Sequence, residues 1–234
     1  MDGSNLEPLA WHAAVVEFDD ILRRVRILLA TTNQSKIAEL QEMMGNLDCE
    51  LIGLSEADST QQIEIASTFA ENSVLKARHY HGLSGLPTIA DDSGLEVEAL
   101  GGAPGVYSAR YAGPEASDAG RIAKLLEEIK DVPPECRGAR FVCAAALVWD
   151  RGEKIFQGEV NGVILDAPRG ANGFGYDPVF LYEPFKKTFA ELTQSEKAKI
   201  SHRGLAFGQL TAWLVESRAL DTQKSNDRIV TTAE

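Results

Sequence analysis

The feature that most constrains the fold is an apolar stretch at residues 25–30 (VRILLA), interrupted only by Arg26, that runs directly into the polar loop TTNQSK. A short run of this kind is typical of a strand that is buried on both faces of a sheet. After the loop, Ile37, Leu40 and Met44 recur with helical spacing. Gly45 then stands where a helix C-cap is expected. The pattern predicts a strand, a tight loop and a helix, which are the building unit of an α/β fold.

The rest of the chain continues this alternation. Thr68-x-x-Glu71 is a capping box and predicts a helix that ends near Tyr80. The other predicted elements are a short strand at 86–90 that ends in a DDSG turn at 91–94, glycine-rich loops at 101–113 and 170–177, a helix that begins after Ser117, a hairpin of residues 141–149 and 154–160, and helices that begin at Thr193 and Ser201. Because a hairpin is combined with alternating strands and helices, we expect an α/β fold with a mixed sheet.

Composition limits the class of protein and its partners. The 234 residues are 44% hydrophobic and 25% charged, which is ordinary globular usage. We divide them into a leader of residues 1–23, a single domain of residues 24–217 and a loose polar tail of residues 218–234. No run of 18 apolar residues occurs, so we expect no membrane partner. With 23 basic against 35 acidic residues, the net charge of −12 argues against nucleic acid as a partner.

Cysteine usage and the N-terminus indicate the compartment. Cys49, Cys136 and Cys143 are few and odd in number, which favours a reducing environment. The acid-rich N-terminus lacks the basic and then apolar pattern of a secretory signal. We therefore expect a cytoplasmic protein.

Two stretches have side chains that suit phosphate and metal. The loop lies between a strand and a helix N-terminus, where backbone N–H groups and the helix dipole attract anions; its residues are Thr31, Thr32, Asn33, Gln34, Ser35 and Lys36. Asp91 and Asp92 are adjacent carboxylates, a type of ligand that suits Mg²⁺, and one of them is suited to activating water. Glu64 is a further carboxylate upstream. Each stretch taken alone is explained as well by a helix cap or a solvated turn.

Three further stretches suit a nucleoside. In GANGFGYD (170–177), glycines let the backbone approach a ligand while Phe174 or Tyr176 stacks on a base. Lys197, His202 and Arg203 offer cations and N–H donors for phosphate or for a carbonyl oxygen. Asn72 and Lys76 lie one helical turn apart, shortly before the two aspartates. Ordinary core packing and solvated helix faces explain each of these alone.

The order of these stretches is more specific than any one of them. TTNQSK, TFAENSVLKAR, IADDSGLEVEALGGAPGVYSARYAG, GFGYDPVF and ELTQSEKAKISHRG closely resemble the inosine triphosphate pyrophosphatase family, in its bacterial-type branch, over residues 25–217. The resemblance implies a two-lobed α/β fold with an elongated mixed sheet flanked by helices and an active-site cleft between the lobes. It also implies Mg²⁺ as cofactor, a homodimer, and hydrolysis of ITP, dITP or XTP to the monophosphate and pyrophosphate.

The resemblance also implies roles for individual residues. Residues 31–36 match the phosphate-contacting loop, with Thr32 at a position where the family often has glycine. Lys76 matches a lysine at the triphosphate, and Asp92 matches the general base and metal ligand. The other matches are Asp91 and Glu64 at the metal, Ser93 at the substrate, Phe174, Gly175, Tyr176 and Asp177 in the nucleoside-binding segment, and Lys197, His202 and Arg203 at the base or phosphates.

We therefore predict an enzyme in which Asp92 activates water while Lys36, Lys76 and Lys197 hold phosphates. Arg203 or a protonated His202 donates to the carbonyl at C6 of the base, where adenine carries a donor of its own. Two alternatives stay open: a pyrophosphatase for other modified nucleotides, and a purine nucleotide-binding sensor that does not hydrolyse. The sequence does not fix the preference among ITP, dITP and XTP.

Overall fold

One mixed sheet of seven strands forms the centre of the protein, in the order β2-β1-β3-β4-β5-β6-β7. This is a computed structural model, which describes residues 25–45, 47, 49–54 and 66–230, and the side chains of residues 26–217 within these ranges. The strands are β1 (Val25–Leu29), β2 (Cys49–Gly53), β3 (Thr88–Val97), β4 (Gly138–Trp149), β5 (Gly152–Ile164), β6 (Phe180–Tyr182) and β7 (Lys187–Thr188). β1 pairs in parallel with β2 and β3, and the other pairs are antiparallel. The predicted mixed sheet is confirmed.

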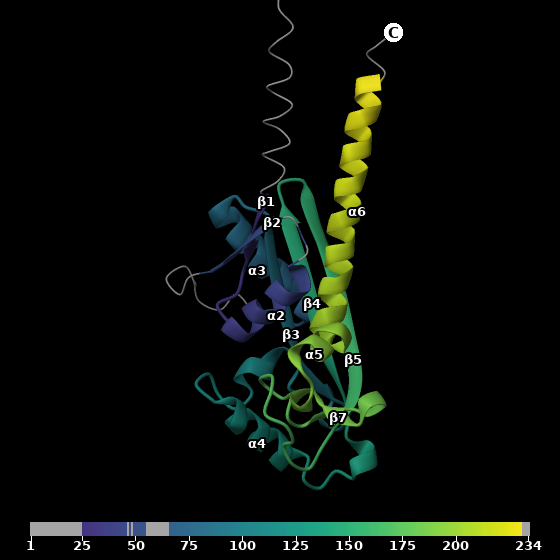
Figure 1. Cartoon of the computed structure of the whole chain (residues 1–234). Helices are drawn as coiled ribbons and strands as arrows, with labels where there is room; N and C mark the ends of the chain where they lie inside the picture. Colours follow the sequence, from purple (N-terminus) through teal and green to yellow (C-terminus); the bar gives the residue numbers. More distant parts are fainter. Residues whose placement is uncertain (1–24, 46, 48, 55–65, 231–234) are drawn as a thin grey trace, which may run out of the picture.

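Helices cover both faces of the sheet (Figure 1). They are α2 (Gln34–Met44), α3 (Phe69–Ser84), α4 (Asp118–Glu128), α5 (Gln194–Ile200) and α6 (His202–Val230). Ile27 and Leu29 of β1 pack in one core cluster with residues of α2 and α6. Leu28 and Ala30 pack in another with residues of α3. Alternate residues of a strand point to opposite faces, so the apolar run is buried on both sides, as predicted.

A separate core fills the other half of the molecule. There, Ile122 and Leu125 of α4 and its C-cap residue Ile129 pack with Phe180 and Phe189. Residues at the far ends of β3, β4 and β5 join the same cluster. Figure 1 shows these three strands running from the half that holds α2 and α3 into the half that holds α4 and β7. The predicted two-lobed architecture is confirmed, because the two halves have separate core clusters and share one elongated sheet.

The most consequential correction concerns the predicted turn at 91–94. β3 runs through all four of these residues and pairs with β4 from Thr88↔Val148 to Val97↔Ala139. Small residues opposite, among them Ala144 and Ala145, allow close packing here. Cations offset the Asp91 carboxylate and N–H donors bind the Asp92 carboxylate, so neither aspartate needs a solvated turn.

Other boundaries also differ from the predictions. α3 continues to Ser84 and ends at Gly85, which has the left-handed conformation of a C-cap. β2 was not predicted. α6 continues through residues 218–230, where the sequence analysis expects a loose tail. This segment contains neither glycine nor proline, the two residues that most disfavour helix. Residues 1–23 and 231–234 lie outside the described residues.

The 101–113 region is the predicted loop, with one short 3₁₀ helix, η3 (Gly105–Arg110), inside it.

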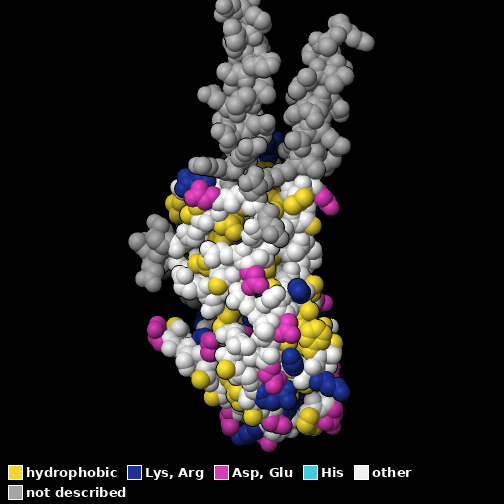
Figure 2. Space-filling view, viewed as in Figure 1, with side chains coloured by type: hydrophobic (Ala, Val, Ile, Leu, Met, Phe, Trp, Pro, Cys, Tyr) yellow, Lys and Arg dark blue, Asp and Glu magenta, His cyan; other side chains and the backbone are white. Residues whose placement is uncertain are grey.

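On the face shown in Figure 2, described basic and acidic side chains are mixed, most densely at the end that carries α4 and β7. Within the part of the chain that the structure describes, no helix has the length and apolarity needed to cross a bilayer.

Candidate active site

A pocket of about 250 Å³ lies where the two halves of the molecule meet. It is lined by Asn33, Ser35, Lys36, Asp92, Ser93, Gly94, Val106, Ser108, Ala109, Asp118, Arg121, Phe141, Phe174, Gly175, Tyr176, Asp177, Lys197, His202 and Arg203. Most of the predicted site residues therefore meet in one place. The other predicted residues are not lining residues of this pocket. Thr31, Thr32 and Gln34 belong to the loop that contains Asn33 and Lys36, Asp91 precedes Asp92 on β3, and Lys76 lies on α3. Glu64 lies outside the described residues.

The loop at 31–36 forms the N-terminus of α2. Asn33 is the N-cap, and its Oδ1 accepts the Lys36 N–H at 3.1 Å. The Thr31 hydroxyl accepts the Asn33 N–H at 3.2 Å, and the Thr32 side chain is exposed. The N-terminal N–H groups of this helix and Lys36 together favour an anion in the adjacent pocket.

Asp92 faces α3, and its carboxylate is held by neutral donors. The Asn72 side chain donates to Oδ2 at 3.0 Å, and the Ser93 N–H donates to Oδ1 at 3.0 Å. Asn72 is fully buried, and its Oδ1 accepts the Ala66 N–H. On the next turn of α3, Lys76 donates to the Asp91 carbonyl at 3.0 Å. The predicted shared face of Asn72 and Lys76 therefore lies against β3, beside the carboxylates.

Asp91 points the other way, toward cations. Its Oδ2 lies 3.0 Å from Lys36 Nζ and 3.1 Å from an Arg203 nitrogen. Burial opposes ionisation of Asp91, but the charges of Lys36, Arg203 and Lys76 outweigh it and hold its pKa far below the usual range. Asp91 is thus ionised and paired.

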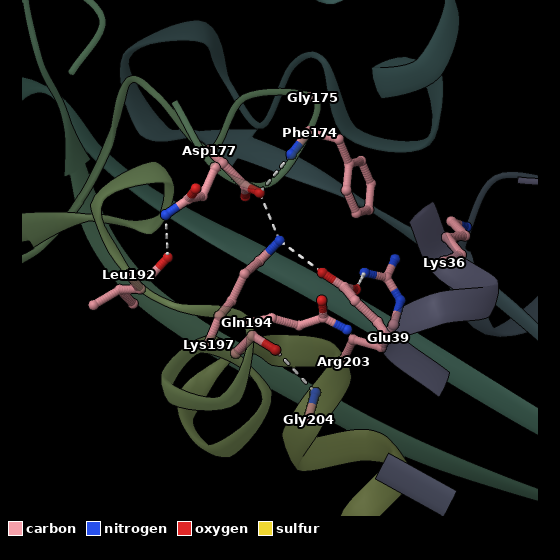
Figure 3. A network of polar contacts seen from close by, with 12 residues as sticks. Lys36, Glu39, Phe174, Gly175, Asp177, Leu192, Gln194, Lys197, Arg203 and Gly204 are labelled. Atoms are coloured by element: carbon pink, nitrogen blue, oxygen red, sulfur yellow. Dashed lines mark hydrogen bonds and ion pairs between the residues drawn. The ribbon is translucent and has the colours of Figure 1, made fainter. Parts of the chain in front are cut away.

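These pairs belong to a chain of alternating charges, and Figure 3 shows the part of it from Asp177 to Arg203. Glu39 lies 2.7 Å from Arg203 on one side and 2.8 Å from Lys197 on the other. Lys197 also reaches Asp177 at 2.5 Å. The order is Asp177, Lys197, Glu39, Arg203, Asp91 and Lys36. Buried charges are tolerated when they are paired in this way.

Glu39 was missed by the sequence analysis. It is 7% exposed, and burial raises its pKa, but Arg203 and Lys197 outweigh burial and lower it. The available signal was its position one residue before the buried Leu40, on the inward face of α2. An acidic residue at such a position needs a cation as partner.

The surroundings of His202 favour the neutral form of its ring. Burial, followed by the charges of Arg203 and Lys197, lowers its pKa well below the usual value. Its ring stacks on Phe141 at 4.7 Å between centroids, and Nδ1 is buried without a hydrogen-bond partner. A neutral imidazole keeps one N–H donor and one acceptor.

The loop after residue 170 presents Phe174 and buries Tyr176. Gly173 and Gly175 have φ of 71° and 62°, a conformation that glycine adopts readily. The Phe174 N–H donates to Asp177 at 2.9 Å, and Lys197 Nζ lies 4.7 Å from the centre of the Phe174 ring. Tyr176 is buried and donates to the Ser108 carbonyl, so it packs in the core, whereas Phe174 is half-buried at the pocket.

A family model described as the Ham1 family matches residues 27–213. The chain belongs to the Ham1 family. A dITP/XTP pyrophosphatase of Frankia alni is 48% identical over 82% of this chain and 98% of its own length. A dITP/XTP pyrophosphatase of Vibrio cholerae is 44% identical over the same shares of the two chains. The predicted resemblance is confirmed.

Solved structures of Ham1 proteins agree. The Ham1 protein of Coxiella burnetii has a TM-score of 0.76 and 46% identity, covering 82% of this chain and 99% of that chain. The Staphylococcus aureus Ham1 protein has a TM-score of 0.74 and 41% identity over the same shares. Since the matched region contains every lining residue of the pocket, the pocket belongs to the part of the chain that the Ham1 family shares.

The residues around Asp92 fit the magnesium ion that the resemblance implies. Mg²⁺ in enzymes is often held by one or two carboxylates together with substrate phosphates and water. Asp92 lines the pocket, and Asn72 and the Ser93 N–H donate to its carboxylate. Asp91 pairs with Lys36 and Arg203 through Oδ2, while its Oδ1 is buried without a hydrogen-bond partner.

Proposed function

We propose that this chain is a nucleoside triphosphate pyrophosphatase that hydrolyses the α–β phosphoanhydride bond of deaminated purine nucleotides such as dITP, XTP and ITP. The observation that carries the proposal is that one pocket joins a helix N-terminus with Lys36, a buried carboxylate at Asp92, and an aromatic ring at Phe174. These are the groups needed for phosphates, for water and for a base. The names of the curated relatives support the same assignment.

Asp92 is the proposed general base. Water attacks the α-phosphorus, its proton passes to the Asp92 carboxylate, and the bond from phosphorus to the bridging oxygen breaks with pyrophosphate as the leaving group. Asn72 and the Ser93 N–H fix the orientation of that carboxylate. Lys36 and the N-terminus of α2 bind the phosphates, and Lys76 contributes positive charge from the opposite face of β3. A bound Mg²⁺ at Asp92 would neutralise charge on the phosphates.

Lys197 serves the base end of the pocket. It is held between Glu39 and Asp177, next to Phe174. The Arg203 guanidinium lies 5.6 Å from the centre of the same ring. A base that stacks on Phe174 thus meets N–H donors, which suit the carbonyl of hypoxanthine or xanthine and oppose the amino group of adenine.

Three further properties belong to the proposal: dependence on Mg²⁺, a homodimer and a cytoplasmic location. The fit of Asp92 supports the first, and the family resemblance supports the second. Cys49, Cys136 and Cys143 are free thiols in the described structure, which supports a reducing compartment. Sedimentation velocity tests the dimer.

The test is a set of initial rates with dITP, XTP, ITP, GTP and ATP at equal concentration, with Mg²⁺ and with EDTA, and with identification of the products. We expect monophosphate and pyrophosphate from the first three nucleotides, little turnover of ATP, and loss of turnover in EDTA. Orthophosphate as the product contradicts the reaction, and equal rates with ATP contradict the base selectivity. Tight binding of dITP without turnover would identify a sensor.

A further inference from the structure

The loop that carries Phe174 is fastened to a helix from a distant part of the chain. Asp118, the first residue of α4, accepts the Gly175 N–H at its Oδ2, at 2.7 Å and across 57 positions of sequence. Asp118 lines the candidate pocket, although no motif of the sequence analysis includes it. A first-turn acid usually interacts with the N-terminus of its own helix. Here the acceptor is turned toward the base-binding loop instead.

A hydrogen bond from another element matters here because the glycine-rich loop backbone can adopt many conformations. Gly173 and Gly175 both adopt positive φ, and glycine has the widest choice of conformations of any residue. Two carboxylates hold the backbone N–H groups on this stretch: Asp177 accepts from Phe174, and Asp118 accepts from Gly175. Asp177 is itself fixed by Lys197. Asp118 therefore constrains the backbone next to Phe174, and with it the position of the Phe174 ring.

Asp118 is itself held in place. Its other oxygen, Oδ1, pairs with Arg121 one turn later on α4. Arg121 also donates to the Ala109 carbonyl at 3.0 Å and to the Ala116 carbonyl at 2.5 Å. Ala109 belongs to η3, which lines the same pocket. Two side chains of α4 thus connect the base-binding loop to the η3 wall.

We propose that Asp118 is a positioning residue for the base: it holds Gly175, and through it the Phe174 ring, in the geometry that stacks on a purine, while Arg121 fixes the Asp118 carboxylate. This inference rests on the proposed function, because it assigns the base to Phe174. Asp118 acts through the loop and not on the phosphates. Its loss therefore affects substrate affinity more than the chemical step.

The first test needs no substrate. Hydrogen exchange of the segment 170–177 is measured in ligand-free wild-type protein and in three variants. Asp118→Ala removes the acceptor, and we expect exchange of the Gly175 amide to accelerate by about tenfold or more. Asp118→Asn keeps a carbonyl acceptor and is expected to restore most of the protection. Glu127→Ala is the matched control, since Glu127 lies on the same helix with its side chain 70% exposed. Equal exchange in wild type and Asp118→Ala overturns the proposal, whether or not the protein is active.

The second test is a double-mutant cycle with dITP. We expect Asp118→Ala to raise KM by about threefold to tenfold and to change kcat less, as loss of one charge-assisted hydrogen bond predicts. In a Phe174→Ala background, Asp118→Ala is expected to raise KM no further, because the ring that it positions is gone. Additive effects on KM would show that Asp118 does not act through Phe174. If the wild-type protein turns over no nucleotide, the proposed function fails, and the exchange measurement still decides the role of Asp118.

Discussion

At the scale of single residues, Asp91 and Asp92 are chemically alike and have opposite surroundings. Asp92 accepts hydrogen bonds from two neutral donors at the pocket. Asp92→Asn preserves the shape of the side chain but leaves one acceptor oxygen for these two N–H donors. We expect this variant to lose kcat by about 100-fold or more, as loss of a general base predicts, and to lose about 1 kcal/mol of stability with the lost hydrogen bond. The measurements are steady-state kinetics and urea unfolding. Turnover close to wild type would remove Asp92 from the role of base.

Asp91→Asn is the variant with which Asp92→Asn is compared. It leaves the buried Arg203 with Glu39 as its remaining carboxylate and removes the carboxylate that pairs with the half-buried Lys36. Breaking a buried ion pair from one side costs about 3–5 kcal/mol, so we expect the free energy of unfolding to fall by that amount. The two neighbouring substitutions therefore separate catalysis from stability.

Local patterns predicted the residues whose chemistry depends only on their neighbours in a short stretch of sequence. The 31–36 loop, the adjacent aspartates and Phe174 between glycines all meet in the pocket. Glu39 and Asp118 were missed because their roles depend on partners 158 and 57 positions away. The neutral state of His202 was missed for a similar reason, since only packing shows that its ring is buried.

At the scale of elements, hydrophobic period and capping residues predicted most helices and strands. The capping box of Thr193 and Glu196 is present in full, and Ser117 caps α4 as expected. One exception was β3, where Asp, Ser and Gly suggested a turn by their local preference. Pairing with β4 and the buried cations override that preference, and neither is visible in a local window.

Close packing of α6 on β5 supports a prediction at this scale. A Cβ at Gly158 of β5 would lie 2.7 Å from the Ala206 backbone nitrogen and 2.8 Å from the Leu205 Cβ. We expect Gly158→Ala to displace the first turn of α6, where His202 and Arg203 lie, with a loss of about 1–3 kcal/mol in stability and a higher KM for dITP. Gly82→Ala, on α3 with no atom within 4 Å of the added Cβ, is the control. It is expected to be neutral or stabilising. Unchanged kinetics and stability in Gly158→Ala would contradict this account of α6.

At the scale of the whole molecule, one sheet spans both halves, and the pocket forms where the halves meet. The Ham1 match ends at residue 213, whereas α6 continues to Val230 (Figure 1). Among the side chains that the structure describes, the last ones that pack against the core clusters are Trp213 and Leu214. The described pocket and its polar network lie entirely before this point. The residues of α6 that line the pocket, His202 and Arg203, belong to its first turn.

A pair of truncations tests this division. A chain that ends after Ser217 keeps both cores and the pocket, so we expect its melting temperature and its kcat/KM for dITP to match the full chain. A chain that ends after Gln209 loses Leu210, which is fully buried, together with Trp213 and Leu214. Removing one buried leucine side chain alone costs about 2–5 kcal/mol, so the shorter chain is expected to unfold at much lower temperature. A large loss of activity after truncation at Ser217, with folding intact, would instead place the end of α6 in function, because no group of the described pocket has then been removed.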